Sequence, residues 1–308
     1  MQSIEKKVIK ILENKNFKFA NLLALKGDAS ERKYFKIKYN KQNLILMYDN
    51  NFKNLGKFLK ITKILKKKVT VPRIIKDFSN EKVLILEDFG NTEYGKLIEE
   101  KNKKQYYKSA IDALIEIQNF FFELPSYSIK EFLRESNLFF EWYIGRTENK
   151  LKLKVNELLK KLIKRTEGLP KVFVHRDYHI DNLFYLKNRN NHFKCGWIDY
   201  QDALIGPCVY DLVSLTQDAR VDVSKKIEKF AIEYYLANTP HIDKNLFIYS
   251  YSIIAIQRHM KVLGIFSRLA KRDGKKKYLS HIPRVKKILI SNLQKEEFSE
   301  LNGFLSDL

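Results

Sequence analysis

Residues 174–183 read VHRDYHIDNL and carry the most informative pattern in the chain. Asp177 precedes Asn182 by five residues, and a second acid, Asp199, follows on an apolar, strand-like run. Phosphoryl transfer to a hydroxyl needs an acceptor for the hydroxyl proton and hard oxygen ligands for the Mg²⁺ that bridges the nucleotide phosphates. The ordered set therefore predicts a kinase-like site in which Asp177 is catalytic and Asn182 and Asp199 bind Mg²⁺. A turn rich in Asp, His and Asn is the competing interpretation of this loop.

Up to Asp88, the apolar residues are mostly arranged as in β-strands, and one segment has helical spacing. The strand-like runs are residues 22–26, 33–39, 43–48, 73–78 and 82–87, and the helical segment is residues 51–68. Beyond Gly90 the apolar spacing is helical, over residues 101–122, 129–146, 151–165, 223–236, 246–270 and 284–293. The pattern predicts an α+β fold with a small antiparallel-sheet, nucleotide-binding lobe (residues 1–88) and a larger, mainly helical, catalytic and substrate-binding lobe (residues 89–308).

Composition limits the function classes. The 308-residue chain has 58 Lys and Arg against 36 Asp and Glu, a formal charge of +22, which raises the question of nucleic-acid binding. Most of this charge is Lys, spread along the chain, whereas nucleic-acid recognition favours Arg, so we expect no nucleic-acid partner. The longest strongly apolar stretch, residues 247–256, is about half a membrane span. The two cysteines make no disulfide framework. We therefore expect a cytoplasmic protein without a membrane partner; its oligomeric state stays open.

The motifs resemble the aminoglycoside phosphotransferase and choline kinase superfamily, which has a protein-kinase-like, two-lobed fold. Its catalytic-loop pattern, His-x-Asp-x-x-x-x-Asn, is matched by His175, Asp177 and Asn182, and its metal-binding Asp by Asp199. A closer similarity is to the bacterial anomeric kinases of N-acetylmuramate and N-acetylglucosamine in cell-wall recycling. The runs that carry this similarity are residues 28–35, 84–90, 198–203, 206–207, 210–215, 257–266 and 272–274. The resemblance implies ATP and Mg²⁺ as cofactors and an amino sugar as acceptor. Aminoglycoside, choline and homoserine kinases of the same superfamily remain the alternatives.

The small lobe departs from the superfamily at the phosphate-binding ion pair. The third strand usually offers a Lys paired with a Glu of the next helix, but here Met47 occupies that region and residues 51–68 contain no acid. A catalytically silent protein is therefore left open. Because both partners are missing together, we expect the phosphates to be held in another way. The candidate ATP-binding residues are Asp28, Ala29, Ser30 and Arg32 for the phosphates, and Glu87 and Phe89, whose backbone lies where similar kinases bind adenine.

Further residues are assigned by the resemblance or by charge. His175 and Asp211 are expected to support the catalytic loop, although Asp211 is also an ordinary acid at a helix start. Arg258 and Lys261 recur with Arg268 and Arg272 at helical spacing. These four residues form either a solvated helix face or, for Arg258 and Lys261, contacts to an anionic acceptor. The residues after the metal-binding Asp, Gln201 and Asp202, are expected to reach sugar groups. A protein kinase is disfavoured because Tyr200-Gln201, not Phe-Gly, follows that Asp.

Overall fold

The structure is a computed structural model, and its description covers residues 4–25, 32–145 and 148–305. By their contacts these residues form two compact units. The first comprises the chain up to Leu97 together with Leu183–Asp202, and the second comprises Ile98–Asn182 together with the chain from Ala203 onward.

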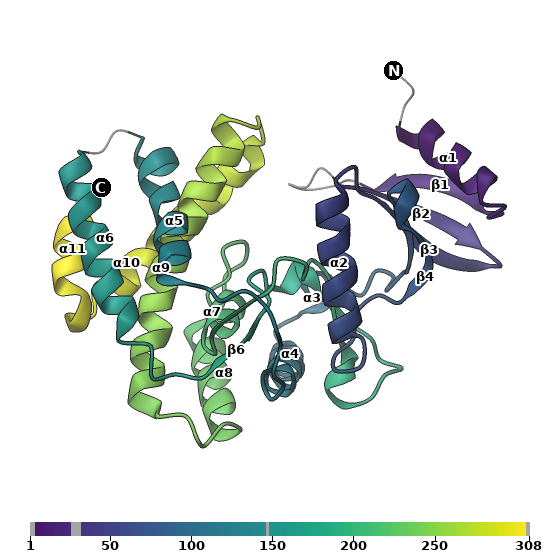
Figure 1. The fold of residues 1–308 in the computed structure, drawn as a ribbon. Helices are drawn as coiled ribbons and strands as arrows, with labels where there is room; N and C mark the ends of the chain where they lie inside the picture. Colours follow the sequence, from purple (N-terminus) through teal and green to yellow (C-terminus); the bar gives the residue numbers. More distant parts are fainter. Residues whose placement is uncertain (1–3, 26–31, 146–147, 306–308) are drawn as a thin grey trace. The chain divides into compact units, whose positions relative to one another are not determined.

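The first unit is built on a five-stranded antiparallel sheet with the strand order β1-β2-β3-β5-β4. The strands are β1 (Ala20–Leu25), β2 (Lys33–Tyr39), β3 (Gln42–Tyr48), β4 (Ile74–Phe78) and β5 (Val83–Glu87). Phe35 pairs with Leu46 and Ile37 with Leu44, and these four side chains are buried. Helix α1 (Ile4–Asn14) packs Val8 and Leu12 onto the same core (Figure 1). The predicted five strands are therefore confirmed.

The predicted helix of this unit is α2 (Phe52–Leu65). It begins after Asn51, whose side chain accepts hydrogen bonds from the backbone N–H groups of Lys53 and Asn54. Its buried face includes Phe58, which stacks on Tyr200 with 5.4 Å between ring centroids. The short helix α3 (Tyr94–Leu97) follows later in the chain.

A short hairpin from later in the chain belongs to the first unit. Strands β7 (Leu183–Tyr185) and β8 (Cys195–Trp197) pair in an antiparallel ladder. Trp197 N donates to Thr70 O over 2.8 Å and Tyr185 N donates to Thr92 O over 2.8 Å, which ties the hairpin to this unit. The lobe boundaries proposed from the sequence assigned residues 183–202 to the larger lobe. Local sequence patterns do not reveal hydrogen bonds between segments that are this far apart in the chain.

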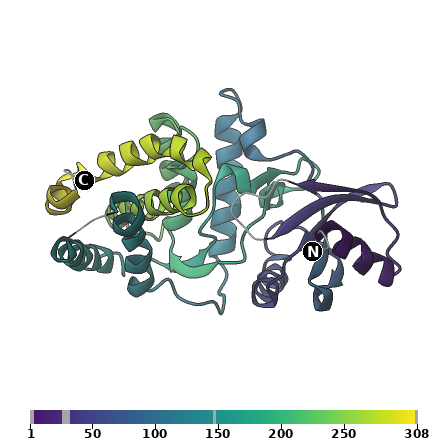
Figure 2. The ribbon, with the colours of Figure 1, turned by 90° about the horizontal axis from the view of Figure 1, so that it is seen from above.

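The second unit is mainly helical and is organised around one long helix, α9 (Lys244–Lys271). The other elements are α4 (Lys103–Gln118), α5 (Ile129–Leu138), α6 (Asn149–Lys164), α7 (Tyr210–Thr216), α8 (Lys225–Ala237), α10 (Ile282–Leu293), α11 (Ser299–Leu305) and the strand pair β6 (Lys171–Val174) and β9 (Leu204–Pro207). Helix α9 contacts α5, α6, α7 and α10, and Figure 2 shows α9 and α10 side by side. Every residue from Ser250 to Gly264 is consequently buried.

None of the helices in the described ranges has both the length and the apolar composition that a membrane span requires.

Candidate active site

The loop of residues 175–182, which the sequence predicts to be the catalytic loop, follows β6 and is held by α7. Asp211, fully buried at the start of α7, accepts hydrogen bonds from the backbone N–H groups of His175 (2.6 Å) and Arg176 (3.0 Å). Burial raises the pKa of Asp211 to about 7, although the two N–H donors act in the opposite direction. Arg176 has a φ of +77°, a left-handed conformation that a side chain other than Gly adopts only when its surroundings enforce it.

Asp177 is half-buried within a group of positively charged and imidazole side chains. Burial alone raises the pKa of its carboxyl group, but Lys261, His179, Arg258 and His175 together outweigh burial and lower this pKa to about 2. The carboxylate is therefore ionised at neutral pH. It can accept a hydrogen bond from an incoming hydroxyl group.

Asn182 ends the loop with its amide group fixed in orientation. Its Nδ2 donates to the backbone carbonyl of Asp177 (3.0 Å) and lies 3.2 Å from Nε2 of His179. Burial, assisted by Arg220, lowers the pKa of His179 well below its usual range, so the ring is neutral and can accept this hydrogen bond. Within the described residues the amide oxygen of Asn182 takes part in no hydrogen bond. That oxygen is a ligand of the kind that Mg²⁺ binds.

Asp199 follows β8 at the open end of the β7–β8 hairpin. Leu183 of β7 pairs with Trp197 of β8, and Asp199 comes two residues after Trp197. Asp199 is exposed and has a φ of +63°. One of its carboxylate oxygens accepts from the side-chain amide of Gln201 over 2.8 Å. The exposed Asp202 instead pairs with Lys57 of α2 over 3.2 Å.

Arg258 and Lys261 do not lie on a solvated face. They are 3% and 8% exposed, because α9 is surrounded by other helices at this point. Arg258 donates to Ser214 Oγ over 2.6 Å, and Lys261 Nζ lies 3.1 Å from the hydroxyl group of Tyr210. The prediction of a solvated face is therefore wrong for these two residues.

The remaining two residues of that helix side differ. Arg268 is half-buried, and Arg272 is exposed and pairs with Asp273 over 2.6 Å. The interpretation as a solvent-exposed helix face therefore holds only at the C-terminal end of α9.

The candidate nucleotide-binding residues lie in the first unit. Asp28, Ala29 and Ser30 are outside the described residues. Arg32 is 6% exposed and its Nε donates to Asp49 at the end of β3 over 2.7 Å. Asp49 also accepts from the backbone N–H of Asn51, over 2.9 Å, at the start of α2. A buried ion pair thus lies beside β3, where the sequence lacks the usual Lys.

Glu87 is the last residue of β5, and Phe89 follows two residues later. The Glu87 carboxylate accepts from Arg73 (3.1 Å) and Arg189 (2.9 Å). Phe89 packs on Phe184 with 5.4 Å between ring centroids.

Three buried residues near these groups were not singled out from the sequence: His179, Asp49 and Glu135. His179 was recognisable as a second His in the quoted loop, but Asp49 and Glu135 gave no local signal. The described residues contain no cluster of three or more His, Cys, Asp or Glu side chains that could hold a metal ion. A Mg²⁺ site of one amide and one carboxylate is smaller than such a cluster, because Mg²⁺ takes its other ligands from phosphates and water.

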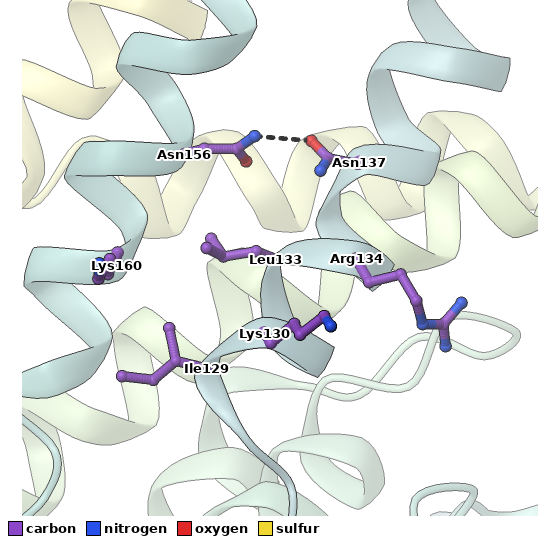
Figure 3. A pocket seen from close by; sticks show the side chains of 7 residues that line it. All are labelled: Ile129, Lys130, Leu133, Arg134, Asn137, Asn156 and Lys160. Atoms are coloured by element: carbon purple, nitrogen blue, oxygen red, sulfur yellow. Dashed lines mark hydrogen bonds between the residues drawn. The ribbon is translucent and has the colours of Figure 1, made fainter.

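A separate pocket of about 540 Å³ lies between α5 and α6 (Figure 3). Its lining consists of Ile129, Lys130, Leu133, Arg134, Asn137, Asn156 and Lys160. None of the predicted site residues is among them.

Comparison with known proteins gives one family match. The model of the phosphotransferase enzyme family matches residues 21–242. An N-acetylmuramate/N-acetylglucosamine kinase of Pseudomonas aeruginosa is 31% identical over 305 residues, which cover 94% of this chain and 89% of that protein. A protein of the same name from Neisseria meningitidis is 32% identical over 277 residues, covering 84% of this chain and 81% of that protein.

Solved structures share the fold. A choline kinase of Streptococcus pneumoniae has a TM-score of 0.67 at 15% identity and covers 94% of this chain and 100% of its own. An ADP-bound aminoglycoside phosphotransferase has a TM-score of 0.62 at 16% identity, with 92% and 96% covered. The predicted protein-kinase-like α+β fold is confirmed.

Proposed function

This chain belongs to the phosphotransferase enzyme family, and from that premise we propose that it transfers the γ-phosphoryl group of ATP to a hydroxyl group of N-acetylmuramate or N-acetylglucosamine. The observation that carries this proposal is the 31% identity, over 94% of the chain, to a kinase named for these two sugars. The anomeric hydroxyl is the proposed acceptor atom, as the sequence resemblance implies. Because ATP is the proposed donor, we also propose that the enzyme works in the cytoplasm.

Asp177 is the proposed catalytic residue. Its ionised carboxylate accepts a hydrogen bond from the acceptor hydroxyl and so orients the oxygen for in-line attack on the γ-phosphorus. The new O–P bond forms as the bond between the γ-phosphorus and the bridging oxygen of ADP breaks. With a pKa of about 2, Asp177 is a weak base that takes the proton only as the O–P bond forms, and then releases it to solvent.

Asn182 and Asp199 are the proposed Mg²⁺ ligands. Support comes from the amide oxygen of Asn182, whose nitrogen is already held by the Asp177 carbonyl and His179, and from the exposed carboxylate of Asp199. Hard oxygen ligands of this kind suit Mg²⁺, which when bound neutralises phosphate charge. Gln201 orients the Asp199 carboxylate through their 2.8 Å hydrogen bond. His175 and Asp211 are proposed to hold the loop that carries Asp177.

Arg32 is the proposed source of positive charge for the nucleotide phosphates, together with the backbone of Asp28, Ala29 and Ser30. Its buried ion pair with Asp49 offers the fixed, oriented cation that a Lys–Glu pair supplies in related kinases. A guanidinium group presents its N–H groups in a planar array that suits phosphate oxygens. The backbone of Glu87 and Phe89 is proposed to contact adenine.

The acceptor is proposed to lie near Asp177, with Arg258 and Lys261 as the positive groups of its site and with Gln201 and Asp202 contributing polar contacts. Both cations are near enough to Asp177 to lower its pKa. A positive environment favours the carboxylate of N-acetylmuramate and opposes a polycationic aminoglycoside. Aminoglycoside or choline phosphorylation is therefore the second candidate and not the first.

The test is a product-resolved assay with purified protein, MgATP and a panel of N-acetylmuramate, N-acetylglucosamine, aminoglycosides and choline. We expect ATP-dependent formation of a sugar 1-phosphate from either amino sugar. The Asp177→Asn variant should lose at least about 100-fold in kcat while still binding ATP. Phosphorylation of aminoglycosides or choline alone would refute the proposed acceptor but not the reaction class. Strong, salt-dependent binding of DNA or RNA without any acceptor-stimulated ATP use would refute the enzymatic assignment.

A further inference from the structure

We propose that Glu135 of α5 is a positioning residue, which ties the catalytic loop to α9. The inference rests on the proposed function and extends it to a residue outside the catalytic loop. The contacts that support it are all made by the buried carboxylate of Glu135, with residues of the second unit.

Glu135 is 2% exposed and contacts side chains from several parts of the chain. Its carboxylate accepts hydrogen bonds from the Tyr127 hydroxyl and from the guanidinium group of Arg176. Lys261 Nζ lies 3.2 Å from Oε2, and the Arg134 guanidinium group lies 3.9 Å from Oε1. A buried carboxylate is tolerated only when charged or polar partners satisfy it. Two of the cations here come from the catalytic loop and from α9.

The contact to Arg176 acts on the residue immediately before Asp177. Arg176 has left-handed backbone angles, and two anchors act on it: its N–H donates to Asp211, and its side chain binds Glu135. The guanidinium group also lies over the Tyr127 ring, 5.5 Å from its centroid. Because the backbone of Arg176 is strained, loss of one anchor lets the loop relax and moves Asp177.

The contact to Lys261 joins Glu135 to α9. Lys261 Nζ lies 3.2 Å from Oε2 of Glu135 and 3.1 Å from the hydroxyl group of Tyr210 in α7. Through Arg176 on one side and Lys261 on the other, Glu135 therefore links the catalytic loop to α9.

The experiment compares Glu135→Gln with Glu131→Gln, a matched control on the same helix. Glu131 is more exposed and pairs with Arg134, which also lies 3.9 Å from Glu135; among the described residues no hydrogen bond or ion pair joins Glu131 to the loop. We expect Glu135→Gln to lower kcat on the order of 10- to 100-fold, with the KM for ATP unchanged, since small misplacements of a reacting group have effects of that size. The control should keep wild-type kcat. A kcat of Glu135→Gln within about twofold of wild type would overturn the proposal.

Two more variants separate charge from packing. Glu135→Asp keeps the charge but shortens the side chain, and we expect it to retain more kcat than Glu135→Gln; a role in packing alone gives the opposite order. The double variant Glu135→Gln/Arg176→Gln removes both partners of the loop contact, and its loss of kcat should be smaller than the two single losses combined because each single variant already breaks the same contact; fully additive losses contradict the link between Glu135 and the loop. If one of these variants fails to fold, the kcat of the other variant still tests the proposal.

The same assays distinguish this inference from the proposed function. Each variant is compared with wild type on whichever acceptor of the panel wild type uses, and on the slow transfer of the phosphoryl group to water. Failure of wild type to phosphorylate either amino sugar refutes the proposed acceptor, while the ratio of Glu135→Gln to wild type still tests Glu135.

Discussion

Gly264 lies where α9 crosses the end of α5, and replacing it with Ala is the most direct test of this packing. A Cβ atom at position 264 would lie 2.3 Å from the carbonyl carbon of Leu138, 2.4 Å from its oxygen and 2.6 Å from its Cβ. Ordinary van der Waals contact begins at 3.4 Å, so the shortest contact is too close by 3.4 − 2.3, or about 1 Å. Because the obstacle is helix backbone, one of the two helices must shift.

The expected loss of stability combines two opposing effects. Overpacking of a well-packed core typically costs 1–3 kcal/mol, and a backbone obstacle places this site at about 3 kcal/mol. The exchange of Gly for Ala in a helix contributes about 1 kcal/mol in the other direction. We therefore expect a net destabilisation of about 2 kcal/mol, which corresponds to a fall in Tm of about 3 °C for a chain of 308 residues.

Gly303→Ala is the matched control, measured beside Gly264→Ala in thermal and urea unfolding. Gly303 lies in α11 and an added Cβ there meets no atom within 4 Å. The control should gain up to about 1 kcal/mol from helix propensity alone. If Gly264→Ala were as stable as wild type, or gained stability as Gly303→Ala does, the close approach of α9 and α5 would be wrong.

Three other substitutions test the candidate site. Asp49→Asn leaves Arg32 buried without its counter-charge, so we expect a loss of about 3–5 kcal/mol in unfolding free energy and a raised KM for ATP; unchanged values would exclude the ion pair as a functional element. His179→Ala removes the group beside the Asn182 amide, and a Mg²⁺ titration of activity should show a 10- to 100-fold loss of apparent metal affinity or kcat, as is typical of groups that orient metal ligands. Because the pKa of Asp177 is lowered to about 2, its carboxylate stabilises the folded state above its ordinary pKa of 3.8 and loses this effect as the pH falls toward 2. Asp177→Asn should therefore be less stable than wild type at pH 7, with a difference that narrows between pH 4 and pH 2 in thermal unfolding; a difference that stays constant down to pH 2 would contradict the lowered pKa.

Local sequence patterns determined the strands of the sheet and the order of the candidate catalytic groups along the chain. Alternating apolar residues such as Phe35 and Ile37 predict strands because one face of each strand must be buried, and the structure buries both side chains. The spacing of Asp177 and Asn182 predicts their roles because both residues lie in one short loop. Such signals lie within a few residues of one another and can be recognised without tertiary structure.

Tertiary structure alone decided the environment of the charged side chains. Arg258 and Lys261 have the helical spacing of a solvated face, but α5, α7 and α10 cover that part of α9 and bury both. Their partners, Ser214 and Glu135, come from distant parts of the chain. A buried charge is determined by which segments pack together, because packing sets both the loss of water and the available counter-charge. Local periodicity encodes neither the loss of water nor the available counter-charge. The sequence therefore determined the positions of the charged residues along the chain, and the tertiary structure determined what each of them contacts.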